Sequence, residues 1–218
     1  MESILEPLIN SPKLNEYVAE LQNRLFEERD KRYAFYESIS EDDKAEFING
    51  NVIMQSPATA FHTSIVANLV NLMRNYVHKQ KLGEIFFEKA LVTLTRNDYE
   101  PDIIFYTSAK ANNIKPEQLK FPAPDLIVEV LSRSTESIDR GVKFEDYAHH
   151  GVDEYWLVDP SKLLIEQYFL SNKNYQLNFK DTKGTIVSRA ITGFKTPVNA
   201  IFDSTENQVE LRSILLGN

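Results

Sequence analysis

The sequence predicts a mixed α/β fold in which helices flank a central β-sheet. Apolar runs rich in β-type residues alternate with segments of helical periodicity. Two of these runs, at 102–106 and 126–131, are apolar almost throughout, as in central strands that are covered on both faces. The order of helix, strands, helix and strand fits helices packed on a sheet.

The first third of the chain carries two helical patterns and one hairpin signal. Residues 14–36 repeat apolar side chains at helical spacing, with charged side chains opposite, which predicts an N-terminal helix. Asn49-Gly50 lies between short apolar arms and predicts a hairpin over 46–54, because both residues tolerate the positive φ of a type I′ turn. A broad apolar face predicts a helix at about 60–80, ended by Gly83.

The rest of the chain is predicted to form strands with one helix between them. A helix is predicted at about 137–150, with Ser137 or a neighbour as its N-cap and Gly151 as its terminator. The expected strands are 84–87, 91–95, 102–106 and 126–131 before this helix, and 154–158, 163–170, 175–179 and 185–191 after it.

Length and composition bound the class of protein. A chain of 218 residues fits one large domain with an appendage, and we expect an N-terminal helical extension over 1–40 and a domain over 41–218. The sequence has no run of 18 apolar residues, so it predicts no membrane-spanning helix. Its acidic N-terminal segment is unlike a signal peptide. We therefore expect a cytoplasmic protein that does not enter a membrane.

Charge and cysteine content exclude some functions. The absence of cysteine excludes disulfides and thiolate zinc sites, and four scattered histidines give no zinc pattern. A formal net charge of −8 disfavours avid, non-specific binding to nucleic acid, which depends on basic contacts to phosphates.

Two acidic residues stand in the predicted central strands. Period-two alternation puts Glu129 on the same covered face as Ile127 and Leu131, and Asp102 opens the other central run. If these strands are neighbours, the two carboxylates can converge. Carboxylate oxygens suit Mg²⁺, which can polarise a phosphodiester and activate water, and a nearby lysine would orient that water.

Three phrases carry a family resemblance. AEFINGNVIM with SPATAFH, then PDLIVEVLSRST, then KFEDYAHHGVDEYWLVDP resemble the Uma-type putative restriction endonuclease family, a domain of unknown function in the PD-(D/E)XK nuclease superfamily. The resemblance covers roughly residues 44–203. It implies a restriction-endonuclease-like fold and a metal-dependent endonuclease that hydrolyses DNA phosphodiester bonds with Mg²⁺ or Mn²⁺.

The resemblance assigns roles to individual residues. Asp102 and Glu129 correspond to the two metal-ligating acids of the motif. The third motif position should be lysine, and this chain has Leu131. Related proteins carry the lysine on the following helix, where Lys143 is the candidate. Two further candidates, Glu46 and His62, match polar positions near the site in the family pattern.

Each candidate also has an ordinary structural interpretation. Glu129 could be an ion-paired carboxylate, Asp102 a turn residue and Lys143 one half of an i,i+4 surface pair with Asp139. Glu46 could pair across a hairpin, and His62 could be a hydrogen-bonded core residue.

The function also has an alternative. Leu131 and the acidic charge leave open a catalytically weak or inactive nuclease-fold module for binding or assembly. On both hypotheses the amphipathic N-terminal helix predicts a homodimer, and on the first the partner is DNA.

Overall fold

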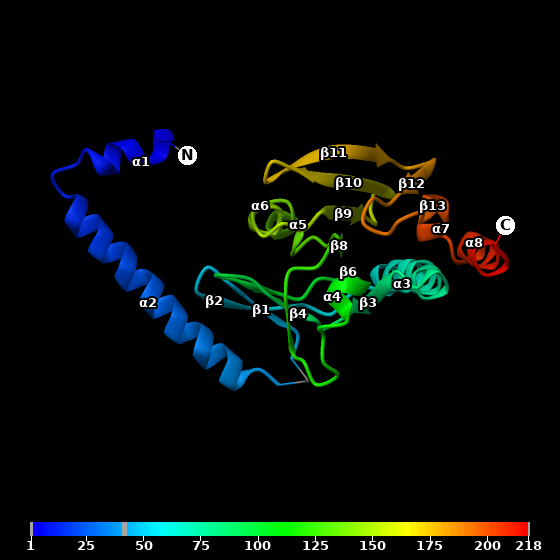
Figure 1. The fold of residues 1–218 in the computed structure, drawn as a ribbon, viewed down its shortest axis with the longest axis horizontal. Coiled ribbons are helices and arrows are strands. Elements are labelled where there is room, and N and C mark those ends of the chain that lie inside the picture. Colours follow the sequence, from blue (N-terminus) through cyan, green and yellow to red (C-terminus); the bar gives the residue numbers. More distant parts are fainter. Residues whose placement is uncertain (1, 41–42, 218) are drawn as a thin grey trace. The chain divides into compact units, whose positions relative to one another are not determined.

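The computed structural model describes residues 2–40 and 43–217 of the chain (Figure 1). Its internal contacts separate two units. The first comprises residues 1–55 and 96–99, and the second comprises residues 56–95 and 100–218. The domain boundary expected after residue 40 stays a prediction.

The first unit consists of two helices and a small antiparallel sheet. The long helix α2 confirms the helix predicted at 14–36, and the pair Asn49-Gly50 has φ of 50° and 79°, as the predicted type I′ turn requires. Arg32 on α2 pairs with the buried Asp98 at 2.6 Å. The elements are α1 (Glu2–Ile9), α2 (Leu14–Ser38), β1 (Ala45–Ile48), β2 (Asn51–Met54) and β5 (Asp98–Tyr99), with β1 between the other two strands. No described helix of the chain is long and apolar enough to cross a membrane.

A six-stranded mixed sheet forms the centre of the second unit, in the order β11-β10-β9-β8-β6-β3. Only the pair β8 and β9 is parallel, and all other neighbours run antiparallel. This arrangement confirms the predicted mixed sheet. The strands are β3 (Gly83–Phe87), β6 (Ile103–Thr107), β8 (Leu126–Val130), β9 (Glu154–Asp159), β10 (Leu164–Ser171) and β11 (Asn174–Asp181).

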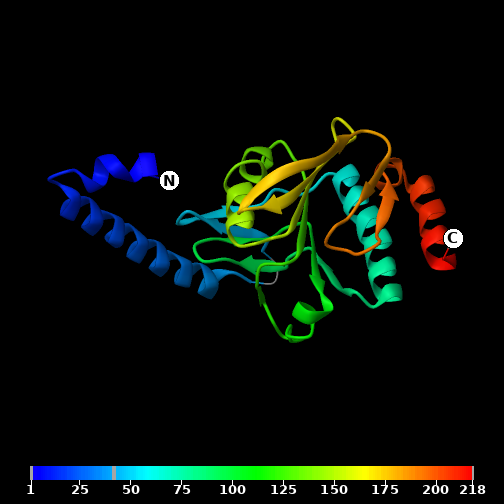
Figure 2. The ribbon, with the colours of Figure 1, turned by 45° about the horizontal axis from the view of Figure 1, so that its top comes forward.

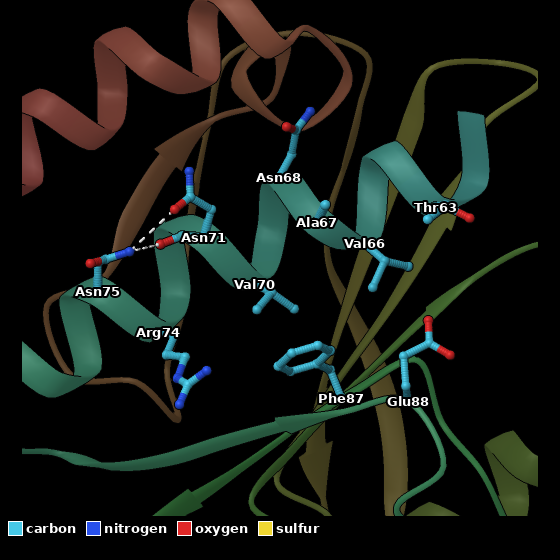
Figure 3. Close-up of a pocket in the computed structure, with 10 residues that line it drawn as sticks. All are labelled: Thr63, Val66, Ala67, Asn68, Val70, Asn71, Arg74, Asn75, Phe87 and Glu88. Atoms are coloured by element: carbon cyan, nitrogen blue, oxygen red, sulfur yellow. Dashed lines mark hydrogen bonds between the residues drawn. The ribbon is translucent and has the colours of Figure 1, made fainter. Parts of the chain in front are cut away.

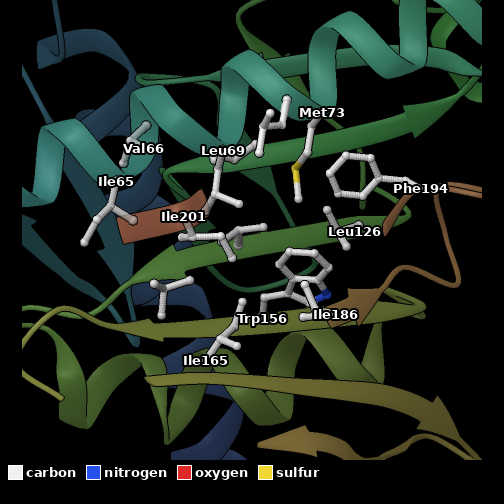
Figure 4. Packing of buried hydrophobic residues seen from close by; sticks show 14 of the residues in the cluster. Ile65, Val66, Leu69, Met73, Leu126, Trp156, Ile165, Ile186, Phe194 and Ile201 are labelled. Atoms are coloured by element: carbon white, nitrogen blue, oxygen red, sulfur yellow. The ribbon is translucent and has the colours of Figure 1, made fainter. Parts of the chain in front are cut away.

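The helix α3 (Ala60–Gln80) covers one face of this sheet and confirms the helix predicted at 60–80. Its apolar residues pack on alternate residues of the strands, including Leu126, Val128 and Trp156, in one buried cluster (Figure 4). The helix ends differently from the prediction. Lys81 takes the left-handed C-cap conformation, and Gly83 already begins β3.

The helix predicted at 137–150 is two helices, α5 (Glu136–Asp139) and α6 (Val142–His149). Gly141 separates them with φ −110° and ψ −104°, outside the helical region. A Cβ at Gly141 would lie 2.7 Å from the carbonyl oxygen of Ser137, so the turn needs glycine. Ser137 itself lies inside α5, and the N-cap position belongs to its near neighbour Thr135, whose side chain makes no capping hydrogen bond.

Smaller elements complete the second unit. Only the first part of the strand predicted at 185–191 forms, as β12. The C-terminal helix α8 was not predicted, because beside the buried Asn207 only the partly buried Leu211 and Ile214 pack on the core, which is a short apolar pattern. Figures 1 and 2 show α8 beside α3. These elements are β4 (Leu91–Thr93) paired with β7 (Lys120–Phe121), α4 (Ser108–Ala111), β12 (Thr185–Val187) paired with β13 (Lys195–Pro197), α7 (Asn199–Phe202) and α8 (Ser204–Leu216).

Candidate active site

The strands that carry Asp102 and Glu129 are neighbours. β6 and β8 pair antiparallel, with Ile103 opposite Val128. Continuing this register by one residue sets Asp102, directly before β6, opposite Glu129 on β8. Residues directly opposite in an antiparallel pair project from the same face of the sheet. The two acids therefore lie on neighbouring strands, and the convergence of their carboxylates on one metal ion stays a prediction.

Asp102 is fixed to the end of β8 by its own carboxylate. Its Oδ2 accepts a hydrogen bond from the backbone N–H of Val130 at 2.8 Å, and its Oδ1 lies 3.3 Å from Nε2 of His62. The backbone N–H of Glu88 donates to the carbonyl oxygen of Asp102 at 3.3 Å. His62, on the first turn of α3, therefore joins the site on the side of Asp102.

Glu129 projects from the face of the sheet opposite to α3, toward α6. Its Oε1 accepts hydrogen bonds from Nζ of Lys143 and from the hydroxyl of Tyr147, each at 3.0 Å. Only 4% of Glu129 is exposed. A carboxylate this deeply buried is tolerated when a cation and a hydrogen-bond donor compensate the lost hydration. Glu129 therefore has the paired setting of a buried structural carboxylate, and its role as a metal ligand stays a prediction.

Lys143 also pairs with Asp139, and this pair is buried. The Nζ of Lys143 lies 3.0 Å from Oδ1 of Asp139, with 2% of each side chain exposed. The interpretation of the two as an ordinary surface pair is therefore wrong. Asp139 is the site neighbour that the sequence reasoning missed. Its signal was the spacing of Asp139, Lys143 and Tyr147 at i, i+4 and i+8, which puts three polar groups on the side that faces the sheet.

An ion-pair network holds the segment that follows Asp139. Arg140 donates to both carboxylate oxygens of Glu166 on β10, at 2.8 and 3.2 Å. Burial alone would raise the pKa of Glu166, but hydrogen bonds from Arg140, Tyr168 and Lys180 outweigh it and lower that pKa to about 2. Glu166 therefore stays ionised, and the turn between α5 and α6 stays anchored to the sheet.

Aromatic side chains hold α6 itself against β9–β11. Phe144 makes edge-on contacts with Tyr155, Tyr168 and Tyr175, with ring centroids 4.9 to 6.0 Å apart. Tyr155 also donates its hydroxyl to the carbonyl oxygen of Asp139 at 3.0 Å. These contacts fix the height of Lys143 above Glu129. Tyr155 and Trp156 are fully buried core residues.

The remaining candidates lie elsewhere or have other partners. Glu46 is a buried residue of β1, in the first unit, and its site role stays a prediction. Asp125, directly before β8, accepts the N–H of Thr107 and pairs with Lys110 at 2.8 Å. Leu131 is a buried apolar residue whose N–H donates to the carbonyl of Val158.

The candidate residues Asp102, Glu129, Asp139 and Lys143 comprise three carboxylates and one ammonium from separate elements, of which Glu129, Lys143 and Asp139 are in direct contact. Their formal charges sum to −2, with the ammonium of Lys143 between Glu129 and Asp139. Within residues 2–40 and 43–217, no cluster of three or more histidine, aspartate or glutamate side chains forms a ready metal cage. The chemistry available is that of a paired-carboxylate site with a buried lysine.

Comparisons with known proteins place this geometry in context. Residues 27–199 match the family described as "Uma2: Putative restriction endonuclease". The match begins inside α2, earlier than the resemblance from residue 44 indicated. Two uncharacterized proteins of Synechocystis sp., slr1290 and sll1609, are 30% and 28% identical over 129 residues. Each alignment covers 58% of this chain, and it covers 66% of the first relative and 72% of the second. The chain therefore spans just under two thirds of the first relative.

A solved structure has the same fold. It is described as a putative nuclease belonging to DUF820 from Anabaena variabilis, and it superposes with a TM-score of 0.67 at 18% identity. The superposition covers 79% of this chain and 96% of that chain. At this identity the likeness establishes the architecture.

Proposed function

The chain belongs to the Uma2 family, and from this premise we propose that it is a metal-dependent endonuclease that hydrolyses DNA phosphodiester bonds. One observation carries the proposal. Asp102 directly precedes β6, Glu129 lies on the neighbouring strand β8, and Glu129 is bound to the buried ammonium of Lys143. Such a set of groups is unusual in a sheet that needs it only for stability, because apolar residues of equal volume would serve as well.

Mg²⁺ or Mn²⁺ fits the donors that this site offers. Magnesium is commonly held by one or two carboxylates and completes its octahedron with waters and substrate phosphate oxygens. The carboxylates of Asp102 and Glu129 supply those two ligands, and the −2 sum over the site matches a divalent cation. When bound, the ion supplies Lewis-acid polarisation of the phosphate and lowers the pKa of a bound water.

Side chains of the protein position the attacking water and stabilise the charge that develops on the phosphate in the proposed reaction. In the proposed reaction, Lys143 donates a hydrogen bond to the attacking water and places a positive charge where negative charge develops on the phosphate. Asp139 and Tyr147 act as positioning residues, because Asp139 holds the ammonium of Lys143 and Tyr147 holds the carboxylate of Glu129. Lys143 thereby takes the place that Leu131 cannot fill.

His62 is a further positioning residue in this proposal. Its ring lies 3.3 Å from the carboxylate oxygen of Asp102 that does not accept the Val130 N–H. The imidazole restrains the rotation of that carboxylate and hence the direction of its lone pairs. His62→Gln should keep this restraint in part, whereas His62→Ala should remove it.

The direct test is cleavage by the full chain. Supercoiled plasmid and labelled oligonucleotides are incubated with Mg²⁺ or Mn²⁺, and we expect cleavage that Asp102→Asn, Glu129→Gln and Lys143→Met each reduce by at least about 100-fold. Glu84→Gln is the matched control, since Glu84 is a half-exposed acid of the same sheet that pairs with His78. Cleavage that survives Asp102→Asn and Glu129→Gln unchanged would show that the assignment is wrong.

The alternative is a nuclease-fold binding module, and one observation favours it. Only 1% of Lys143 is exposed, and both of its described carboxylate partners hold it inside the protein. Calorimetric titration with Mg²⁺ and Mn²⁺ separates the two functions. The nuclease requires divalent binding at millimolar concentration or tighter, abolished by Asp102→Asn. No binding and no cleavage would favour the module.

A homodimer is part of both functions. Val18, Leu21 and Leu25 of α2 are each more than 40% exposed, although they form one apolar stripe of the helix. Exposed apolar stripes of this kind are typical of association surfaces. Light scattering should give twice the chain mass for the wild type and a lower mass for Leu21→Glu with Leu25→Glu. A wild-type monomer at micromolar concentration would remove the dimer.

A further inference from the structure

A groove of about 690 Å³ runs along the side of α3 that faces the turn after β3 (Figure 3). Val70 and Arg74 line it from the helix, and Phe87 and Glu88 line it from the turn. Figure 3 shows Phe87 pointing toward Val70, with Arg74 one helical turn further along. The groove therefore has an apolar, aromatic middle and a cation near one end.

The other end of the groove adjoins the candidate active site. Glu88 donates its backbone N–H to the carbonyl oxygen of Asp102. Thr63, which also lines the groove, is the sequence neighbour of His62, and His62 contacts the carboxylate of Asp102. Eleven residues of helix separate Thr63 from Arg74, which is about 16 Å at 1.5 Å per residue. A strand advancing about 3.4 Å per nucleotide would cover this length with four to five nucleotides.

Two of the lining groups, Phe87 and Arg74, are of the kinds that bind an unstacked nucleic-acid strand. Phe87 is 41% exposed, and its ring face is available to a base. Arg74 is exposed and makes no hydrogen bond or ion pair with the described part of the chain, so its guanidinium is available to a phosphate. The turn beside them is held in an uncommon conformation, since Glu88 and Lys89 have φ of 55° and 47°. Strained turns of non-glycine residues gather at functional sites.

We propose that this groove binds a single-stranded segment of nucleic acid next to the bond to be cut, with a base on Phe87 and a phosphate on Arg74. The inference rests on the proposed nuclease function and adds its substrate class: nucleic acid with a gap, flap or overhang. Two arguments favour a single strand over a duplex. A duplex hides its base faces from Phe87, and one arginine on a chain of net charge −8 is too few to hold two phosphate backbones.

Fluorescence anisotropy on the full chain tests the groove without relying on catalysis. A labelled 15-nucleotide single strand and the matching duplex are titrated in EDTA, so that neither a metal nor cleavage contributes. We expect tighter binding of the single strand. Phe87→Ala should weaken it about tenfold, because a base that stacks on an aromatic ring loses that contact. Arg74→Ala should lower the slope of log K against log salt by about 0.7, as loss of one phosphate contact to a single strand requires.

Matched controls separate the groove from general effects. Phe61 lies on the same helix with the same 41% exposure and does not line the groove, so Phe61→Ala should leave single-strand binding unchanged. Lys183, an exposed cation in the turn after β11, is the control for Arg74 and should leave the salt slope unchanged on replacement by alanine.

The binding and cleavage experiments test the groove proposal and the nuclease proposal independently. Binding that depends on Phe87 and Arg74, in a protein that cleaves nothing, keeps the groove and removes the nuclease. Cleavage that needs Glu129, with binding indifferent to Phe87 and Arg74, keeps the nuclease and overturns the groove. The groove proposal is also overturned if Phe61→Ala weakens single-strand binding as much as Phe87→Ala does, or if the protein prefers the duplex. It is overturned as well if the protein binds no nucleic acid, which would point to a peptide as the occupant.

Discussion

Replacing Lys143 by methionine should strongly destabilise the protein, because it removes a buried cation. The substitution keeps most of the side-chain volume, so it isolates the effect of the charge. In the wild type, the Nζ of Lys143 lies 3.0 Å from Oε1 of Glu129 and 3.0 Å from Oδ1 of Asp139. Methionine fills a similar space, so no large cavity contributes to the loss. What remains is a pair of carboxylates at the interior of the sheet without the ammonium that they share.

The size of the effect follows from those distances. Two oxygens that each lie 3.0 Å from one nitrogen are at most about 6 Å apart. At an effective dielectric constant of about 20, two unit charges at that separation repel by roughly 3 kcal/mol. Breaking a buried pair by removing one partner generally costs about 3–5 kcal/mol. We therefore expect Lys143→Met to lower the free energy of unfolding by about 3–5 kcal/mol.

Urea denaturation followed by tryptophan fluorescence measures this loss through the buried Trp156. With a slope of about 2–3 kcal/mol per molar for a chain of this size, the midpoint should fall by about 1–2 M. Lys162→Met is the matched control, since Lys162 pairs with Asp159 at 2.7 Å but is 61% exposed, and its midpoint should hardly move. Equal midpoints for the two variants would refute the argument that burial makes the Lys143 pair important.

Three further outcomes are expected. Glu166 has a folded pKa of about 2, below its ordinary 4.5, so its stabilisation is complete above pH 4.5 and is lost as the pH falls from 4.5 toward 2. Glu166→Gln should therefore lower the melting temperature at pH 7 and flatten its fall across that window. Gly141→Ala should cost more than about 1 kcal/mol in urea denaturation, since its Cβ would meet a backbone oxygen at 2.7 Å. Gly83→Ala should cost more, at least about 2 kcal/mol, because its Cβ would lie 1.9 Å from the carbonyl oxygen of Tyr106.

The central strands and long helices could be predicted because their patterns are dictated by burial. The run at 126–131 is apolar because α3 and α6 cover opposite faces of β8, and this is the signal that the sequence carried. The turn at Asn49-Gly50 was equally visible, because two consecutive residues with positive φ need such residue types. The residue pattern of a segment therefore predicts its secondary structure well when the whole segment is buried in the same way or when its turn requires particular residue types.

The break at Gly141 and the helix α8 could not be predicted for the opposite reason. Gly141 is required by the close approach of the Ser137 carbonyl, a contact that helical periodicity does not encode. The helix α8 has a good N-cap, since Asp203 accepts from the N–H groups of Thr205 and Glu206, but its apolar contact with the core is limited to the partly buried Leu211 and Ile214. A helix that buries little leaves little trace in its sequence.

The misinterpretation of Asp139 has a more general physical cause. An i,i+4 acid–lysine pair has the same sequence spacing on a surface and in a core, and only tertiary packing distinguishes the two. Here the packing comes from Phe144 against Tyr155 and Tyr175, which press α6 onto the sheet and take the Lys143 ammonium out of water. Once α6 is fixed, the ammonium of Lys143 reaches the carboxylate of Glu129 from the helix. A lysine at position 131, two residues after Glu129 on the same strand, would reach that carboxylate from the sheet. Leu131 is then released for the apolar core, and in the proposed nuclease Lys143 supplies the positive charge that the motif places on the strand.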